Sequence, residues 1–332
     1  MRQIHNMKCA WLETLRAGKS GKRAVRPWSN VAAGQRYAMA IAKIFNADLV
    51  HDSESWKNFI KNDYDVIFVG YSTRYQEYKA DVQFIEKNPN ALIVHISTEY
   101  ENAAPASLYY ANRPFLHIAN YVDIPKQQMT GAWKLRDEFK HVNVNALLYY
   151  DSNSKQQKNR SCIYWGRYRP DRAKYLKIFA DAGVDISTSP KNIKKWIDAG
   201  VTAKTWLNKV LWIPSRESIC EYMYSVYAED VYTHTNYNCP ANRWYESLCC
   251  DVQPLIHISC KGTFEKSGYV IHDDMWFDTS ECLRVKRQGT KLRNHLSKWR
   301  IETKRCCAEE RTSVARQIKD MVATCLSPPR HV

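Results

Sequence analysis

The segment that decides the fold reads DVYTHTNYNCPANRWYESLCCDVQPLI and spans residues 230–256. It predicts a strand, a loop, a helix over 242–250 and a further strand over 253–258, an order typical of a parallel α/β sheet. Arg243 lies near the start of this helix, where a guanidinium can pair with phosphate. Glu246, one turn later, can accept hydrogen bonds from vicinal ribose hydroxyls. As an alternative, these two side chains stand at i and i+3 and could simply pair with each other.

The sequence before this segment shows the same alternation. A strand over 161–165 runs into a turn that contains Gly166, Arg167 and Arg169, and a helix follows directly. The other elements expected in this half are strands over 184–187, 210–213 and 230–235 and helices over 171–182 and 219–228. A glycine turn, a helix start and two guanidinium groups at the carboxyl edge of a sheet suit a diphosphate.

The first half of the chain also alternates between strand-like and helix-like stretches. Short apolar runs bounded by polar residues predict buried parallel strands over 4–12, 48–50, 66–70, 92–97 and 115–119, with helices over 29–45 and 75–88. The polar stretch 151–160 is a linker candidate, and the chain becomes helical and charged from Arg284 to Cys325.

These patterns predict an α/β protein of two Rossmann-like domains facing a cleft, with a C-terminal helix that crosses back. A chain of 332 residues is long enough for two domains of about 150 residues each. We expect an N-terminal acceptor-binding domain over 1–155, a nucleotide-sugar-binding domain over 156–300 and a C-terminal helix over 301–332 that packs across both.

The motif Asn242-Arg243-Trp244-Tyr245-Glu246-Ser247-Leu248, followed by Pro254-Leu255-Ile256, resembles the donor-binding signature of GT-B glycosyltransferases. The turn at Trp165-Gly166-Arg167 is also similar to that of the donor domain in this fold. The resemblance implies that Glu246 binds the ribose, that Arg243 and Arg167 face the diphosphate, and that Asn242 belongs to the same donor site. Many retaining members carry a second Glu eight residues before the ribose Glu, where this chain has Asn238. This departure favours an inverting reaction or a diverged family.

An inverting transfer needs a general base that takes the proton of the acceptor hydroxyl. We expect this base at the carboxyl end of a strand in the N-terminal domain. Glu99 and Glu101 directly follow the strand over 92–97, and Asp123 follows the strand over 115–119. The order of preference is Glu99, Asp123, Glu101.

A net charge of +15 and a pI near 9.2 predict attraction to polyanions, of which nucleic acid is the commonest inside a cell. The loop after the first strand gathers the residues expected to contact DNA: Lys19, Lys22, Arg23, Arg26 and Trp28. In length and charge the chain resembles the bacteriophage GT-B enzymes that glycosylate 5-hydroxymethylpyrimidines such as hydroxymethylcytosine in DNA. This resemblance implies double-stranded DNA as acceptor, a UDP-sugar as donor and a base flipped out of the duplex.

The sequence lacks the apolar region of a signal peptide and any run of about 20 apolar residues. Eleven cysteines without a C-x-x-C pair indicate free thiols in a reducing compartment. We therefore expect a cytoplasmic monomer, in an infected host cell if the gene is from a phage, with no membrane partner. We expect no metal ligands and no required cofactor, although a divalent metal is compatible with the fold. The alternatives are a GT-B enzyme that acts on a surface glycan or lipid, and a DNA-binding protein without catalysis.

Overall fold

A computed structural model describes residues 6–12, 16–17, 23–24, 33–50, 53–69, 88–97, 115–120, 139–149, 157–208, 216–288 and 290–327. The chain divides into two compact units, residues 1–148 with 311–332 and residues 149–310. The long helix α13 (Ser297–Leu326) contributes residues to both units. No helix among these described ranges is long and apolar enough to cross a membrane.

The first unit is built on a parallel sheet in the order β4-β1-β5-β6-β7-β8. Its strands are β1 (Cys9–Leu12), β4 (Asp48–Val50), β5 (Val66–Val69), β6 (Leu92–Ser97), β7 (Phe115–Ala119) and β8 (Phe139–His141). The apolar runs of β1 and β5 are buried at every position, as expected for strands covered on both faces. The remaining elements of this unit are the hairpin β2 (Arg16–Ala17) and β3 (Arg23–Ala24), helices α1 (Ala33–Phe45) and α2 (Ser53–Phe59), and the short helix η6 (Val144–Leu148).

In the first sheet, the direction in which the chain adds strands reverses after β4. This strand pairs with β4 on one side and with β5 on the other, so the chain progresses outward in both directions from the gap between β1 and β5. The carboxyl end of such a strand lies at a topological switch point, the usual place for ligands in open α/β sheets. The basic loop predicted to meet the acceptor begins here, directly after Leu12.

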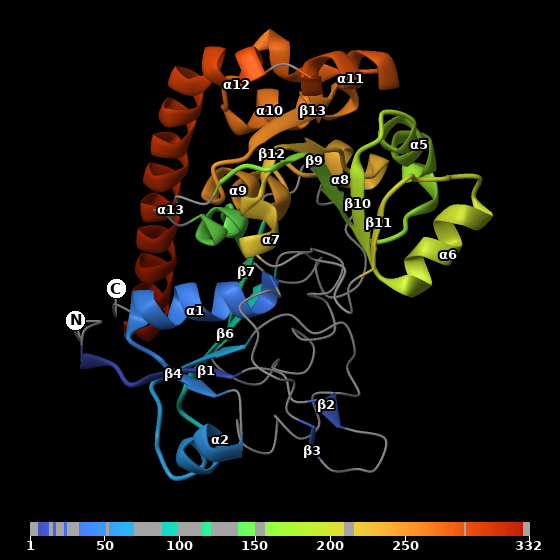
Figure 1. The fold of residues 1–332 in the computed structure, drawn as a ribbon. Helices are drawn as coiled ribbons and strands as arrows, with labels where there is room; N and C mark the ends of the chain where they lie inside the picture. The colour runs from blue at the N-terminus through green and yellow to red at the C-terminus, as the bar shows by residue number, and fades with distance from the viewer. Residues whose placement is uncertain are drawn as a thin grey trace. The chain divides into compact units, whose positions relative to one another are not determined.

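The second unit contains a parallel sheet in the order β11-β10-β9-β12-β13-β14 (Figure 1). Its strands are β9 (Arg160–Trp165), β10 (Asp185–Thr188), β11 (Trp206–Asn208), β12 (Tyr222–Tyr227), β13 (Gln253–His257) and β14 (Trp276–Phe277). Numbered within the unit, this order is 3-2-1-4-5-6, the strand order of dinucleotide-binding folds. The expected α/β class with two parallel sheets is therefore confirmed.

The helices of the second unit follow the strands in alternation. They are η7 (Pro170–Arg172), α5 (Ala173–Asp181), α6 (Pro190–Asp198), α7 (Arg216–Cys220), α8 (Val231–Asn236), α9 (Asn242–Cys249), η8 (Ile258–Cys260), α10 (Lys261–Ser267), η9 (Asp273–Met275), α11 (Ser280–Gln288) and α12 (Thr290–His295). Tyr164 of β9, Phe179 of α5 and Trp196 of α6 are fully buried in one apolar cluster. Gly183 ends the α5 segment at φ 68°, a backbone conformation that glycine adopts without strain.

Two elements predicted around the decisive segment were wrong. Residues 222–227, expected within a helix, form β12, which is hydrogen-bonded between β9 and β13. Residues 230–235, expected as a strand, lie in α8 and its cap, because the Asp230 carboxylate accepts the backbone N–H of Thr233 at 2.9 Å. The strand predicted over 210–213 falls outside the described residues, as does most of the helix predicted over 75–88.

Candidate functional site

The candidate site lies at the carboxyl ends of β9 and β12. These strands are neighbours in the sheet, with Tyr224 opposite Cys162 and Ser225 opposite Ile163. The chain leaves β9 toward β10 on one side and leaves β12 toward β13 on the other. The gap between β9 and β12 is therefore the topological switch point of the second sheet, where this class of fold binds nucleotides.

Gly166 makes a tight turn directly after β9. Its backbone N–H donates to the Ser187 carbonyl at 3.2 Å, and its carbonyl accepts the Thr188 hydroxyl at 2.8 Å. A Cβ atom at this position would lie 2.9 Å from the Tyr164 hydroxyl, closer than side-chain contacts allow. The glycine predicted from the sequence is thus required by the close approach of Tyr164.

Beside this turn, Arg172, Arg243, Glu229 and Asp230 form a buried ion-pair cluster. One terminal nitrogen of Arg172 lies 2.7 Å from the Glu229 carboxylate and 2.5 Å from that of Asp230. A terminal nitrogen of Arg243 lies 2.8 Å from Glu229 and donates to the Ala228 carbonyl at 2.6 Å. The cluster pairs two cations with two carboxylates, which satisfies charges that would be costly to bury alone.

The protonation states of the cluster follow from these contacts. Burial opposes the charge of Arg172, but the neighbouring Glu229 carboxylate, Tyr164 hydroxyl and Asp230 carboxylate raise the pKa of Arg172 above its usual value. Burial likewise opposes ionisation of Asp230, yet Arg172 and the two donors of Thr233 hold the pKa of Asp230 below its usual range. Arg172 and Asp230 are accordingly both ionised at neutral pH.

Two further cations stand beside the cluster at the surface. Arg167 is exposed, and Arg169 leaves 55% of its side chain exposed while its Nε lies 4.0 Å from the Asp230 carboxylate. The short helix η7, continuous with α5, begins immediately after Arg169. Exposed guanidinium groups next to a helix start can bind an anion such as a diphosphate.

Helix α9 carries the rest of the predicted donor motif. Its N-cap residue, Ala241, provides no side-chain hydrogen bond to the first turn, and Asn242 is half-buried. Glu246 is 2% exposed, and its carboxylate accepts the indole N–H of Trp165 at 3.1 Å. This bond ties α9 to the carboxyl end of β9. Just before the helix, the buried Asn238 Oδ1 has no hydrogen-bond partner within the described part of the chain.

The structure therefore brings Gly166, Arg169, Arg243 and Glu246 to one place. Arg243 and Glu246 do not need each other as partners, since Arg243 pairs with Glu229 and Glu246 with Trp165. The Nε atoms of Arg172 and Arg243 are buried without a hydrogen-bond partner in the described ranges. Both atoms are shielded from solvent, so they are unsatisfied donors inside the cluster and not contacts open to a ligand.

No family model matches the chain, and no curated protein does. Among solved structures, the catalytic domain of starch synthase IV from Arabidopsis thaliana, bound to ADP and acarbose, is similar to this chain. The two share 10% identity over 90% of this chain and 79% of the other, with a TM-score of 0.40. At this level the likeness carries no argument about this chain.

Sequence reasoning missed the partners of the two buried arginines. Arg172, Glu229 and Asp230 were not among the expected site residues. The sequence signal for them is the pair Glu229-Asp230 directly after the run over 222–228. Because that run was expected to be helical, the pair was not recognised as lying at a strand end, where carboxylates meet ligands or cations.

The expected catalytic and acceptor-binding residues cannot be placed in the same way. Glu99, Glu101 and Asp123 lie outside the described residues, as do Lys19, Lys22, Arg26 and Trp28. Arg23 lies in β3, which pairs with β2, and its backbone alone is described. These assignments stay predictions.

Proposed function

We propose that the protein is a GT-B-type glycosyltransferase that moves a sugar from a UDP-sugar to the hydroxyl of a hydroxymethylated pyrimidine in DNA. The observation that carries the proposal is the position of the donor motif. Gly166, Arg169, Arg243 and Glu246 gather at the switch point of a sheet with the strand order of dinucleotide-binding folds.

In this proposal the donor binds along the carboxyl edge of the second sheet. The exposed side chains of Arg167 and Arg169 would contact the diphosphate, together with the helix start that follows them. Arg243, held by its pair with Glu229, would add positive charge near the diphosphate. Glu246 would accept hydrogen bonds from the ribose hydroxyls, oriented by Trp165.

The chemical step would be a single displacement at the anomeric carbon. Glu99, or Asp123 in its place, takes the proton of the acceptor hydroxyl as that oxygen forms its bond to the anomeric carbon. The bond from this carbon to the diphosphate oxygen breaks, and UDP leaves with the electron pair. The arginines beside the diphosphate would stabilise the negative charge that develops on it.

The proposed acceptor follows from charge and from the position of the basic loop. The chain carries a net charge of +15, and the loop with Lys19, Lys22, Arg23 and Arg26 begins at the switch point of the first sheet. A cationic loop at a ligand-binding edge suits a phosphate backbone. A duplex base must leave the stack before its hydroxymethyl group can enter an active site, and Trp28 could take the place of the flipped base.

The test is incubation of the protein with a panel of UDP- and ADP-sugars and with DNA that contains hydroxymethylated or unmodified pyrimidines. Mass spectrometry of the released nucleosides should show one added sugar on the hydroxymethylated base and none on unmodified DNA. Sugar hydrolysis or transfer to a lipid or glycan acceptor, with no DNA product, would overturn the DNA acceptor while keeping the transferase. No nucleotide-sugar binding at all would overturn the proposal as a whole.

A further inference from the structure

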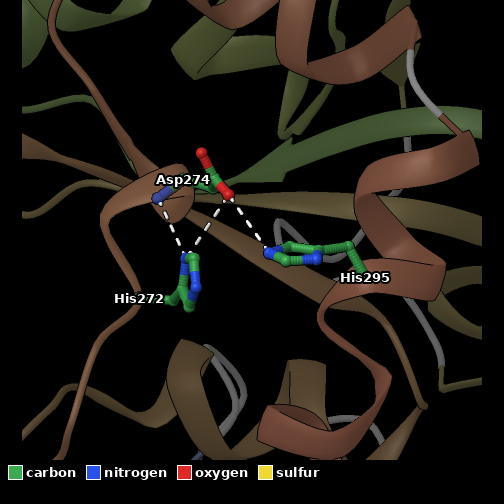
Figure 2. Close-up of side chains that lie close together, drawn as sticks. All are labelled: His272, Asp274 and His295. Atoms are coloured by element: carbon green, nitrogen blue, oxygen red, sulfur yellow. Dashed lines mark hydrogen bonds and ion pairs between the residues drawn. The ribbon is translucent and has the colours of Figure 1, made fainter.

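Away from the donor site, three potential metal ligands converge beside β14, the outermost strand of the second sheet. Figure 2 shows that the side chains of His272, Asp274 and His295 point toward one another. His272 Nδ1 and His295 Nε2 each lie 3.5 Å from the same oxygen, Oδ2 of Asp274. All three ligand atoms lie within 4.8 Å of one another. Two strands, β12 and β13, separate β14 from β9 and its glycine turn.

The Oδ2 atom of Asp274 faces both imidazole rings. His272 Nδ1 accepts the backbone N–H of Asp274 at 3.3 Å, a long hydrogen bond made by the same lone pair that a metal ion would take. A bound ion would therefore replace this weak bond. Lys286 contacts this segment through its ammonium, but at the backbone carbonyl of Asp274 and not at the carboxylate.

The ligand types and their spacing indicate which cation fits. Imidazole nitrogen together with carboxylate oxygen suits zinc and neighbouring transition metals better than Mg²⁺ or Ca²⁺, which prefer oxygen ligands. Bonds of about 2.0–2.1 Å at tetrahedral angles place two ligand atoms about 3.3–3.4 Å apart, whereas octahedral angles bring them to about 3.0 Å. The two 3.5 Å contacts to Asp274 Oδ2 are closer to the tetrahedral spacing than to the octahedral one, and small rotations of these exposed side chains would bring all three ligand atoms to bonding distance.

We propose that His272, Asp274 and His295 bind one zinc ion, with water as the fourth ligand. The side chains are 41%, 50% and 59% exposed, so the ion can enter from solvent without unfolding. His272 and Asp274 flank the start of η9, which leads into β14, while His295 ends α12 and precedes α13. The bound ion would therefore fasten the last strand of the sheet to the C-terminal helices. This site is independent of the proposed transferase activity.

The sequence signal for this site is weak. The spacing His-x-Asp with a second His 21 residues later fits no standard zinc pattern, and the absence of C-x-x-C led us to expect no metal ligands. The three residues become a site only because the turn at η9 and the end of α12 come together in space.

The test is zinc binding by the full chain after chelator treatment and dialysis, followed by calorimetric titration with zinc alone. The unaltered protein should bind one equivalent. Because each variant removes a direct ligand, His272→Ala, Asp274→Asn and His295→Ala should each weaken binding at least about 100-fold, beyond what outer-shell changes cost. Asp273→Asn, which removes the adjacent exposed carboxylate, should bind as the unaltered protein does.

Cobalt serves as a spectroscopic probe of the same site, because the chain also has eleven cysteines that could capture metal. Co²⁺ should give the strong visible absorption of a tetrahedral ion without a thiolate charge-transfer band. Absence of binding, a thiolate band, or equal stoichiometry in the three ligand variants would each overturn the proposal. Circular dichroism of the metal-free variants should match that of the parent, since all three side chains are at the surface.

Discussion

Arg243 and Glu229 form an ion pair of 2.8 Å in which each residue is only 4% exposed. Glu229 also pairs with Arg172 at 2.7 Å, so one carboxylate serves two buried guanidinium groups. Glu229→Gln removes that negative charge, so Asp230 is then the carboxylate left in the cluster for the two buried arginines. We expect it to lower the free energy of unfolding by about 3–5 kcal/mol, measured by urea denaturation.

The matched control is Glu221→Gln. Glu221 pairs with Arg160 at 3.3 Å, but the two side chains are 34% and 44% exposed, and solvent screens such a pair. Its removal should cost no more than about 1 kcal/mol. Equal losses in the two variants would show that burial does not set the strength of the cluster.

Glu246 is expected to contribute to nucleotide affinity through its carboxylate. Hydrogen bonds to a charged acceptor contribute roughly 1.5–3 kcal/mol, so Glu246→Gln should weaken UDP binding by about 10- to 150-fold in calorimetry. Trp165→Phe removes the indole donor and keeps the carboxylate, and its loss of affinity should be smaller. The ribose assignment is wrong if Glu246→Ala binds UDP as tightly as the unaltered protein.

The fold was predictable where the sequence pattern was unambiguous. β6 and β7 were predicted to the residue, and α9 to within one, because polar or turn residues bound their apolar runs. β12 was not predicted as a strand. A short apolar run in the middle of a sheet lacks the alternation of apolar and polar residues that would distinguish a strand from a buried helix. In α8 the β-branched residues favoured a strand, but the Asp230 side chain caps a helix there instead.

Part of the candidate site could also be predicted from the sequence. Gly166 and Arg243 were recognisable because each occupies a position with a physical requirement, a tight turn and a helix start. The ion pairs of Arg172 and Arg243 with Glu229 and Asp230 could not be predicted, because they form only where two strand ends meet in space. From the sequence alone, the partners expected for Arg243 are a phosphate group or Glu246.

The basic loop is expected to make DNA binding strongly dependent on salt. Six phosphate contacts would lower affinity about 1000-fold between 50 and 200 mM salt, because each contact contributes about 0.9 to the slope of log K against log salt. Changing Lys19, Lys22, Arg23 and Arg26 together to Ala should reduce that slope by roughly 3 to 4, as measured by fluorescence anisotropy with duplex DNA.

A control of equal charge removes four exposed lysines of the second unit, Lys191, Lys194, Lys204 and Lys298. If these residues do not contact DNA, the slope should stay near that of the unaltered protein. A flat salt dependence in the unaltered protein, or equal slopes in both quadruple variants, would exclude the loop as the DNA contact.

The general base is expected to be Glu99. Glu99→Gln keeps the shape of the side chain but cannot accept the proton of the acceptor hydroxyl, so transfer should fall by about 100-fold or more. UDP affinity should not change, because the donor residues lie in the other unit. Asp123→Asn is the comparison: if it abolishes transfer while Glu99→Gln remains fully active, the base is Asp123.

His95 is expected to make the first unit sensitive to acid. The side chain is fully buried in β6, its ring lies 4.8 Å from that of His117, and burial lowers the pKa of His95 to about 4. The unfolded chain, with a His pKa of about 6.5, binds a proton at pH values where the folded protein does not. Stability from this group is therefore complete above about pH 6.5 and declines as the pH falls toward 4, by roughly 3 kcal/mol at pH 4.

His95→Gln removes the titration while keeping a polar side chain, so the variant can be compared with itself across pH. Its free energy of unfolding, measured by urea denaturation between pH 4 and 7, should fall by about 3 kcal/mol less over this range than that of the unaltered protein. An acid response that is the same in His95→Gln as in the unaltered protein would assign the sensitivity to another buried group, with His257, whose pKa burial also lowers to about 4, as the first to test.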